Sequence, residues 1–282
     1  MKKKILLLGG YGFIGGFFFK TYKKKYTIYR FGRFLKNQKI TLSRLLKINT
    51  SFDIIIDCSG GSSVLESIKN PKKELSKTIL TIRSVIKFLK KLKKKPIYIF
   101  LSSAAVYGNS KGKKLEPISN YGRNKLLAEN ALKKISKKEK IPLVIIRFYS
   151  IFGNGLKKQL IWDTIKKISK NQRLFFGTGY EKRSWLHVYD AVRLIEASIL
   201  ISRVSGKIID APSKYTLQNK VMIQKIFNIL KYKKKPIFTN TNRLGDPLQL
   251  ITKNKKYKNF KWKQKKDLNK ELKNYVKWYL NK

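Results

Sequence analysis

Three polar residues of this sequence have types and a spacing suited to proton transfer. Tyr121 and Lys125 stand four residues apart in Tyr-Gly-Arg-Asn-Lys, which would place the phenol and the ammonium on one face of a helix. A neighbouring cation lowers the pKa of a tyrosine from about 10 toward a value useful for acid–base catalysis. Ser103 carries a hydroxyl that can hydrogen-bond a reacting oxygen. Because lysine is so frequent here, the pair predicts catalysis only in the company of other motifs.

Glycines at three-residue intervals form the second chemical signal. Gly9, Gly12 and Gly15 lie in the stretch GGYGFIG, between an apolar segment and a helical one. The first glycine permits a tight turn, the second allows a pyrophosphate to approach the backbone, and the third allows close helix–strand packing. Free N–H groups at the helix start, where Phe13 and Ile14 stand, favour bound phosphate. We predict a dinucleotide site; glycines that merely ease packing are the alternative.

The segment after the second predicted strand lacks the acidic residue that usually binds the ribose hydroxyls of NAD. It reads Tyr-Arg-Phe-Gly-Arg, and no Asp or Glu occurs before Asp53. Arg30 and Arg33 are two of only eleven arginines in the chain. A pair of guanidinium groups can clamp a ribose 2′-phosphate. We therefore expect NADP as the favoured cofactor, with NAD as the alternative.

The hydropathy pattern indicates the scaffold that would position these residues. Short apolar segments alternate with amphipathic ones without a hairpin signal, which is typical of a doubly wound, mostly parallel α/β sheet. Polar residues at the carboxyl ends of such strands, Ser103 among them, face the ligand crevice. The expected strands cover 4–8, 26–31, 52–58, 96–101, 143–148 and 173–176, and the expected helices cover 13–22, 72–93, 121–135, 157–170 and 189–202.

The combination of GGYGFIG, SSAAVYG and YGRNK resembles the extended short-chain dehydrogenase/reductases, the NAD-dependent epimerase/dehydratase family that acts on nucleotide sugars. The resemblance continues in order through RFYSIFG (147–153), RSWLHVYD (183–190), RLGDP (243–247) and FKW (260–262). Seven ordered matches across essentially the whole chain are far more specific than any one of them. The resemblance implies a Rossmann-type fold with a smaller C-terminal substrate-binding lobe.

The resemblance also implies roles for individual residues. Tyr121 would be the acid/base, Lys125 its partner and a ligand of the cofactor ribose, and Ser103 the ligand of the substrate oxygen. The nucleotide-diphosphate sugar would contact four further residues, namely Ser150, Gln159, Arg183 and Arg243. We expect the dinucleotide-binding domain to span 1–155 and to receive roughly 186–209, with a discontinuous substrate lobe mainly from 156–282. The helices over 72–93 and 121–135 would pair in a homodimer.

Departures from the family pattern narrow the range of reactions that we expect of this chain. Dehydratases of the family carry Thr-Asp-Glu where this chain has Ser103-Ala104-Ala105, so the acids that assist loss of water are absent. Arg30 and Arg33 favour an NADPH-dependent 4-keto-sugar reductase. The alternative is an NAD-dependent nucleotide-sugar 4-epimerase, which keeps its cofactor and returns the hydride to the same sugar.

Charge is the most unusual bulk property of the chain. Lys and Arg total 66 against 15 Asp and Glu, a formal net charge of +51. Such an excess can indicate a nucleic acid or another polyanion as partner. Arginine, which makes forked contacts to phosphates and bases, is scarce, and the lysines are spread from Lys2 to Lys282. We expect background charge and no specific nucleic-acid partner; a non-catalytic dinucleotide- or RNA-binding scaffold is the second alternative.

Cysteine and histidine each occur once, as Cys58 and His187. One cysteine cannot form an intrachain disulfide, and one histidine makes a zinc site very improbable, so we expect no metal. The N-terminal stretch ILLLGGYGFIGGFFF is too short and too glycine-rich for a membrane span, and no small-residue cleavage site follows it. We expect a folded strand and helix there, no membrane insertion and a cytoplasmic location.

Overall fold

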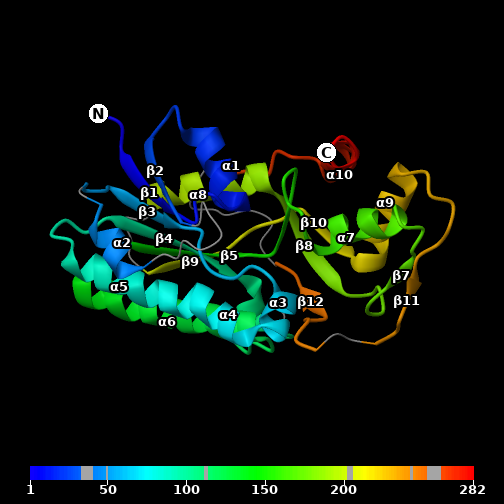
Figure 1. Cartoon of the computed structure of the whole chain (residues 1–282), viewed down its shortest axis with the longest axis horizontal. Coiled ribbons are helices and arrows are strands. Elements are labelled where there is room, and N and C mark those ends of the chain that lie inside the picture. The colour runs from blue at the N-terminus through cyan, green and yellow to red at the C-terminus, as the bar shows by residue number, and fades with distance from the viewer. Residues whose placement is uncertain (33–40, 49, 111–113, 202–205, 242–243, 253–261) are drawn as a thin grey trace.

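A six-stranded, all-parallel sheet forms the centre of the fold (Figure 1). The structure is a computed structural model, and it describes residues 1–32, 41–48, 50–110, 114–201, 206–241, 244–252 and 262–282. The strand order is β2-β1-β3-β4-β5-β9. Because β2 and β3 lie on opposite sides of β1, the order reverses there, and such a switch point is where open parallel sheets bind ligands. The strands are β1 (Lys4–Leu8), β2 (Thr27–Phe31), β3 (Ile54–Asp57), β4 (Ile97–Ser103), β5 (Leu143–Phe148) and β9 (Lys207–Asp210).

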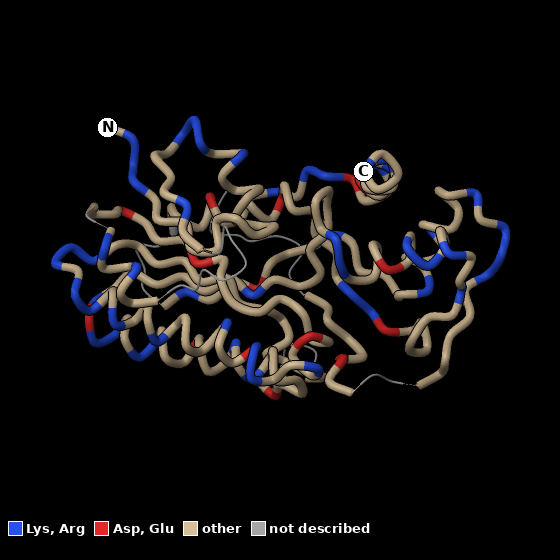
Figure 2. The backbone as a smooth tube through the Cα atoms, viewed as in Figure 1, with Lys and Arg blue, Asp and Glu red and all other residues tan. Residues whose placement is uncertain are grey.

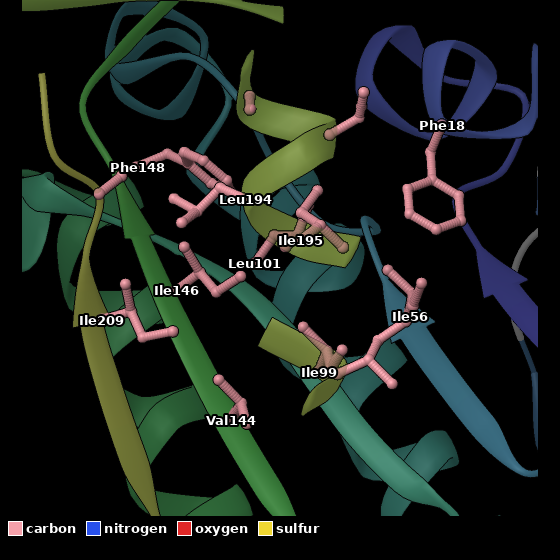
Figure 3. Packing of buried hydrophobic residues seen from close by; sticks show 14 of the residues in the cluster. Phe18, Ile56, Ile99, Leu101, Val144, Ile146, Phe148, Leu194, Ile195 and Ile209 are labelled. Atoms are coloured by element: carbon pink, nitrogen blue, oxygen red, sulfur yellow. The ribbon is translucent and has the colours of Figure 1, made fainter. Parts of the chain in front are cut away.

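Helices cover both faces of this sheet, as the sequence predicts for a doubly wound fold (Figure 1). One face packs against α1 (Phe13–Tyr22) and α8 (Val188–Ile201); Figure 3 shows Phe18 of α1 and Leu194 of α8 over the strands. The other face packs against α2 (Leu42–Leu46), α5 (Thr81–Lys91) and α6 (Asn120–Glu139). Strands buried on both faces explain the continuous apolar runs of the sequence.

The helix predicted over 72–93 is interrupted. The structure has α3 (Val64–Lys69), α4 (Pro71–Leu75), a π-helical turn (Ser76–Leu80) and then α5. The π turn inserts extra backbone into a helix whose apolar periodicity is otherwise regular, and such turns occur frequently at functional sites. The predicted helix over 13–22 and the strands over 4–8 and 143–148 have the bounds that the sequence indicates.

A second, smaller layer of structure lies beyond the carboxyl ends of the main sheet. Its central strand is β8 (Lys182–His187), which pairs with β6 (Ser150–Phe152), β10 (Tyr215–Gln218) and β12 (Gln249–Leu250). A further two-stranded sheet joins β7 (Leu174–Phe175) to β11 (Ile237–Phe238), and the helices are α7 (Gln159–Ile168), α9 (Asn219–Ile229) and α10 (Leu268–Leu280). Together they bury a separate apolar cluster.

The basic residues are distributed over the whole outline of the molecule. Figure 2 shows Lys and Arg along the outer helices and in the peripheral loops at both ends. This distribution favours background charge over a dedicated binding arm. In the part of the chain that the structure describes, no helix combines the length and the apolarity needed to cross a bilayer.

Candidate active site

One cavity of about 590 Å³ opens at the carboxyl ends of β1, β3 and β4. The switch point of the sheet therefore carries the hollow that topology predicts for it. Nine of the residues predicted for the site line this cavity: Gly9, Gly12, Phe13, Ile14, Gly15, Ser103, Tyr121, Lys125 and Gln159. They come from segments up to 150 residues apart and meet only through the fold.

The glycine turn after β1 fits a dinucleotide diphosphate. Gly9 has φ of +70°, and a Cβ on it would lie 2.7 Å from the carbonyl oxygen of Cys58. A Cβ on Gly15 would lie 2.5 Å from the carbonyl oxygen of Gly9, so only glycine allows α1 to pack this closely. No side chain caps α1, whose N-cap is Gly12. The first N–H groups of the helix are therefore available to a phosphate.

Asp57, at the end of β3, orders the loop that forms the opposite wall of the cavity. Its carboxylate accepts hydrogen bonds from the backbone N–H of Ser59 (2.8 Å) and from the Ser59 hydroxyl. The hydroxyl of Tyr98 donates to its other oxygen at 2.6 Å. Asp57 is fully buried, so these three donors hold a desolvated carboxylate in place. The sequence indicated no role for Asp57. In the structure, its hydrogen bonds to Ser59 hold the start of the loop over 59–62 in place.

Ser103 and Tyr121 meet where β4 ends and α6 begins. Ser103 is the last residue of β4, and its hydroxyl accepts from the N–H of Ala105 at 3.2 Å. Tyr121 is in the first turn of α6, which Ser119 caps by accepting from the N–H of Gly122. The Ser103 hydroxyl is near enough to the Tyr121 phenol for hydrogen bonding to act on the pKa of Tyr121. The two hydroxyls can therefore contact one substrate oxygen from adjacent positions.

The pKa of Tyr121 differs from the expectation that its lysine partner lowers it. Burial raises the pKa of Tyr121 to about 12, the hydrogen bond with Ser103 opposes this rise, and the charge of Glu74 adds to it. Lys125 lies one turn away but donates to the carbonyl oxygens of Leu101 (2.9 Å) and Ser59 (3.5 Å). Burial in turn lowers the pKa of Lys125. Desolvation therefore dominates both groups, and Tyr121 is a neutral proton donor near pH 7.

Glu74 is a buried acid beside the site that the sequence did not single out. It is 4% exposed, and its carboxylate accepts from the hydroxyl of Thr78 at 2.7 Å. The same Thr78 oxygen accepts from the N–H of Gly61 at 3.0 Å, so the π turn is tied to the loop after β3. Burial raises the pKa of Glu74. Because Lys72 and Lys73 precede it, the sequence around Glu74 is typical of a solvated, basic helix face.

Two further lysines line the cavity. No sequence pattern distinguishes them from the many other lysines of the chain. Lys77 belongs to the π turn, and Lys158 is the N-cap of α7. Burial, followed by the charge of Lys77, lowers the pKa of Lys158. Lys158 donates to the hydroxyl of Ser62 in the loop after β3. Cationic groups held partly out of water in this way favour an anionic ligand.

Arg30 is not among the residues that line the cavity. Its Nε donates to the carbonyl oxygen of Gly10 at 3.0 Å. Its guanidinium also stacks on the rings of Tyr11 (4.0 Å to the centroid) and Phe19 (4.6 Å). These contacts give Arg30 a structural role in holding the glycine turn against β2. Arg33, the other half of the predicted 2′-phosphate clamp, lies outside the described residues.

Two of the remaining predicted substrate contacts, Ser150 and Arg183, do not line the cavity. Ser150 stands between two lining residues, Tyr149 and Ile151, without lining the cavity itself. Arg183 is buried, pairs with Asp246 at 3.2 Å and donates to the carbonyl oxygen of Leu248. That ion pair joins two segments of the sequence resemblance, RSWLHVYD and RLGDP. Arg243 lies outside the described residues.

Ser103 and Tyr121 could transfer a proton beside a glycine turn that fits a dinucleotide diphosphate. The described residues hold no group of three His, Cys, Asp or Glu side chains that could bind a metal ion. The sole histidine, His187, is buried away from the cavity, and its Nδ1 accepts from the N–H of Tyr189. The two positions after Ser103 carry Ala104 and Ala105, both buried, so no carboxyl group stands there.

Comparison with known proteins places these features in a family. A family model described as the NAD dependent epimerase/dehydratase family matches residues 5–206. The UDP-glucose 4-epimerase of Mycoplasma genitalium is 25% identical over 234 residues, which cover 67% of this chain and 69% of the relative.

Two solved structures show the same fold over the whole chain. The UDP-glucuronic acid 4-epimerase of Bacillus cereus, in complex with UDP-glucuronic acid and NAD, superposes with a TM-score of 0.86 at 20% identity and covers 99% of each chain. The UDP-N-acetylglucosamine 4-epimerase of Methanobrevibacter ruminantium, in complex with UDP-N-acetylmuramic acid, gives 0.83 at 21% identity and covers 100% of this chain and 99% of the other. At these identities the likeness concerns the fold.

Proposed function

The chain belongs to the NAD dependent epimerase/dehydratase family, and we propose that it is an NAD-dependent 4-epimerase of a nucleotide-linked hexose. The observation that carries the proposal is the single cavity in which the glycine turn, Ser103, Tyr121 and Lys125 meet. A dinucleotide-binding scaffold without catalysis has no need of the last three residues. The relatives and structural neighbours named above, which are epimerases, support the same assignment.

The proposed reaction has two halves of opposite direction. In the first, the phenolate of Tyr121 takes the proton of the sugar 4-hydroxyl while the hydrogen on C4 leaves as hydride. The glycine turn of Gly9, Gly12 and Gly15 would hold the dinucleotide, which would supply reversible hydride transfer at C4 and so allow the hydride to return to the opposite face of the sugar. In the second half, Tyr121 returns the proton to the oxygen, which Ser103 orients throughout. Sugar and cofactor end at their original oxidation levels, so no reductant is consumed.

The residues of the site favour epimerisation over the two related reactions. Loss of water needs acids beside the serine, where this chain has Ala104 and Ala105. A reductase that turns over NADPH would benefit from a 2′-phosphate clamp, but Arg30 is engaged with Gly10 and two aromatic rings. We therefore favour NAD over NADP, which reverses the preference that the two arginines suggested from the sequence.

The proposal includes the organisation of the chain. Residues 1–155, with roughly 186–209, would bind the dinucleotide, and most of 156–282 would bind the nucleotide sugar. We further propose a homodimer through the face of α5 and α6, where Leu127 of α6 is 56% exposed. A sharp monomer mass in light scattering at micromolar concentration would argue against the dimer. We place the enzyme in the cytoplasm, because its one cysteine, Cys58, serves no disulfide.

The proposal is tested by incubating the purified protein with UDP-glucose and, separately, with UDP-N-acetylglucosamine, without added reductant. We expect the 4-epimer of one of them to form until equilibrium is reached, with NAD recovered from the denatured protein. Tyr121→Phe, which preserves the ring, should lower the rate by at least about a hundredfold, the loss typical of a missing acid/base. Product formation that requires stoichiometric NADPH would instead establish the reductase.

A further inference from the structure

Lys158 and Gln159 connect the two parts of the molecule at the rim of the cavity. Lys158 donates to the hydroxyl of Ser62, and the side-chain amide of Gln159 donates to the carbonyl oxygen of Ser62 at 3.5 Å. Ser62 belongs to the loop after β3, whereas the other two residues begin α7 in the second layer. Two successive residues of one segment therefore converge on one residue of another, 96 and 97 positions away.

The backbone at this junction has a conformation that needs support. Gln159 has φ of +71°, a value that L residues other than glycine adopt rarely. Such conformations persist where surrounding contacts determine them, and they gather at ligand clamps. The contacts to Ser62 are the ones that the structure provides here. Tertiary contacts therefore hold the start of α7 at the cavity in a backbone conformation that an isolated segment would not favour.

The junction lies on the same side of the cavity as the glycine turn. A Cβ on Gly155 would lie 3.9 Å from the ring of Phe13, the first residue of α1. Leu156 and Phe13 pack in one apolar cluster. The loop that carries Ser62 also passes the turn, since a Cβ on Gly9 would lie 2.9 Å from the nitrogen of Ser59. Lys158 thus lines the same cavity as Gly12 and Phe13, where the first N–H groups of α1 would hold a diphosphate.

The ammonium of Lys158 forms none of the close ion pairs of the described residues, and only the more distant carboxylates of Glu66 and Glu74 attract it. Ser62 is a neutral acceptor, and Lys77 repels the ammonium. Partial burial disfavours the charge as well. A bound anion would relieve both penalties, because a charge-assisted hydrogen bond to a phosphate oxygen is about twice as strong as a neutral one.

We propose that Lys158 clamps the diphosphate of the bound dinucleotide together with the start of α1, so that the second layer of the molecule closes over the cofactor and retains it. This inference rests on the proposed dinucleotide-binding function and assigns to it a residue outside the glycine turn. Ser62 positions the ammonium at the rim. The clamp suits an enzyme that keeps its cofactor through many turnovers, since loss of NAD would need α7 to move away from the loop.

The test measures binding and not activity. On protein from which bound NAD has first been removed, NADH fluorescence should give a dissociation constant about 10- to 100-fold higher for Lys158→Ala than for the wild type, through faster dissociation in stopped-flow displacement. Lys158→Arg, which retains a donor cation, should remain within about threefold of the wild type. Lys157→Ala is the matched control, because Lys157 is the exposed neighbour in the same segment and should leave NADH binding unchanged.

A second arm separates the two diphosphates that the enzyme would bind. Calorimetric titration with UDP should give equal affinities for the wild type and Lys158→Ala. Weakened UDP binding with unchanged NADH binding would assign Lys158 to the nucleotide sugar and overturn the inference. Equal NADH affinity in the wild type, Lys158→Ala and Lys157→Ala would also overturn it while leaving the proposed function intact. A wild type that binds no NADH would refute the function as well.

Discussion

Tyr121 lies in surroundings that oppose ionisation of its phenol. Burial and the charge of Glu74 raise its pKa, and the Ser103 hydrogen bond only partly offsets them. Glu74 is held by Thr78, which belongs to the π turn. The interrupted helix thus places an acid where it acts on the phenol of Tyr121. A phenol kept neutral is a competent proton donor for the reductive half and must be deprotonated for the oxidative half.

The first prediction concerns this acid. Glu74→Gln removes the negative charge and should lower the pKa of Tyr121, because the carboxylate raises it. The phenolate needed for the oxidative half then forms at lower pH, so the rising limb of the kcat profile moves toward acid. At pH 6 we expect kcat to increase by up to about tenfold, the effect of one unit in an acid–base pKa. Steady-state rates from pH 5.5 to 9 measure this shift.

The control for Glu74→Gln is Glu66→Gln, which removes an exposed acid from α3 that does not act on Tyr121. Its pH profile should coincide with that of the wild type. If Glu74→Gln also leaves the profile unmoved, Glu74 is protonated in the active enzyme and exerts no charge on the phenol, which contradicts the electrostatic role given to it here.

At the scale of elements, a buried ionic network fixes α6 against the main sheet. Glu129 of α6 is fully buried and forms a forked pair with Arg147 of β5, at 2.6 and 3.0 Å. The hydroxyl of Ser102, next to Ser103 in β4, donates to the same carboxylate at 2.6 Å. Because α6 also carries Tyr121, this network sets the position of the Tyr121 phenol relative to Ser103.

The second prediction follows from that burial. Glu129→Gln leaves the guanidinium of Arg147 without its counter-charge, and breaking a buried pair from one side costs about 3–5 kcal/mol of unfolding free energy. Urea unfolding measures the loss. Glu139→Gln is the control, since the Glu139–Lys95 pair (3.2 Å) lies nearer the surface and should contribute less than about 1 kcal/mol. Equal losses of unfolding free energy in the two variants would contradict the claim that burial makes the Glu129–Arg147 pair the larger contributor to stability.

The sequence predicted the elements whose signals are local. The glycine turn, the first helix and the apolar strands follow from periodicity and glycine spacing, and they indicated the fold class. The π turn could not be predicted, because extra backbone inside a helix leaves the apolar stripe nearly regular. Glu74 and Lys158 were missed for a different reason. Each looked like one more charged residue of a basic chain, and only tertiary packing partly buries them beside the cavity.

At the scale of the whole molecule, the charge of +51 acts on stability. Basic residues surround the molecule (Figure 2), so their mutual repulsion is larger in the compact state than in the unfolded chain. Salt screens such repulsion over about 10 Å at 0.1 M. The charge therefore makes the folded state sensitive to ionic strength without giving it a specific partner.

The third prediction is that salt stabilises the protein. Raising NaCl from 50 to 300 mM should increase Tm by roughly 2–3 °C, equivalent to about 1–2 kcal/mol for a chain of this size. KCl at equal ionic strength should have the same effect, because screening does not depend on the cation. A Tm that falls or stays constant, as measured by differential scanning calorimetry, would show that self-repulsion does not limit stability.

The most direct test of the central claim follows the hydrogen on C4 of the sugar. UDP-glucose or UDP-N-acetylglucosamine carrying deuterium at C4 is incubated with the enzyme and unlabelled NADH in solution, and the 4-epimer is analysed by mass spectrometry. We predict that the epimer retains the deuterium at C4, because the hydride returns to the same sugar from a cofactor that stays bound. An epimer that has lost the deuterium to the NADH pool, or a reduced product without epimer, would contradict the assignment.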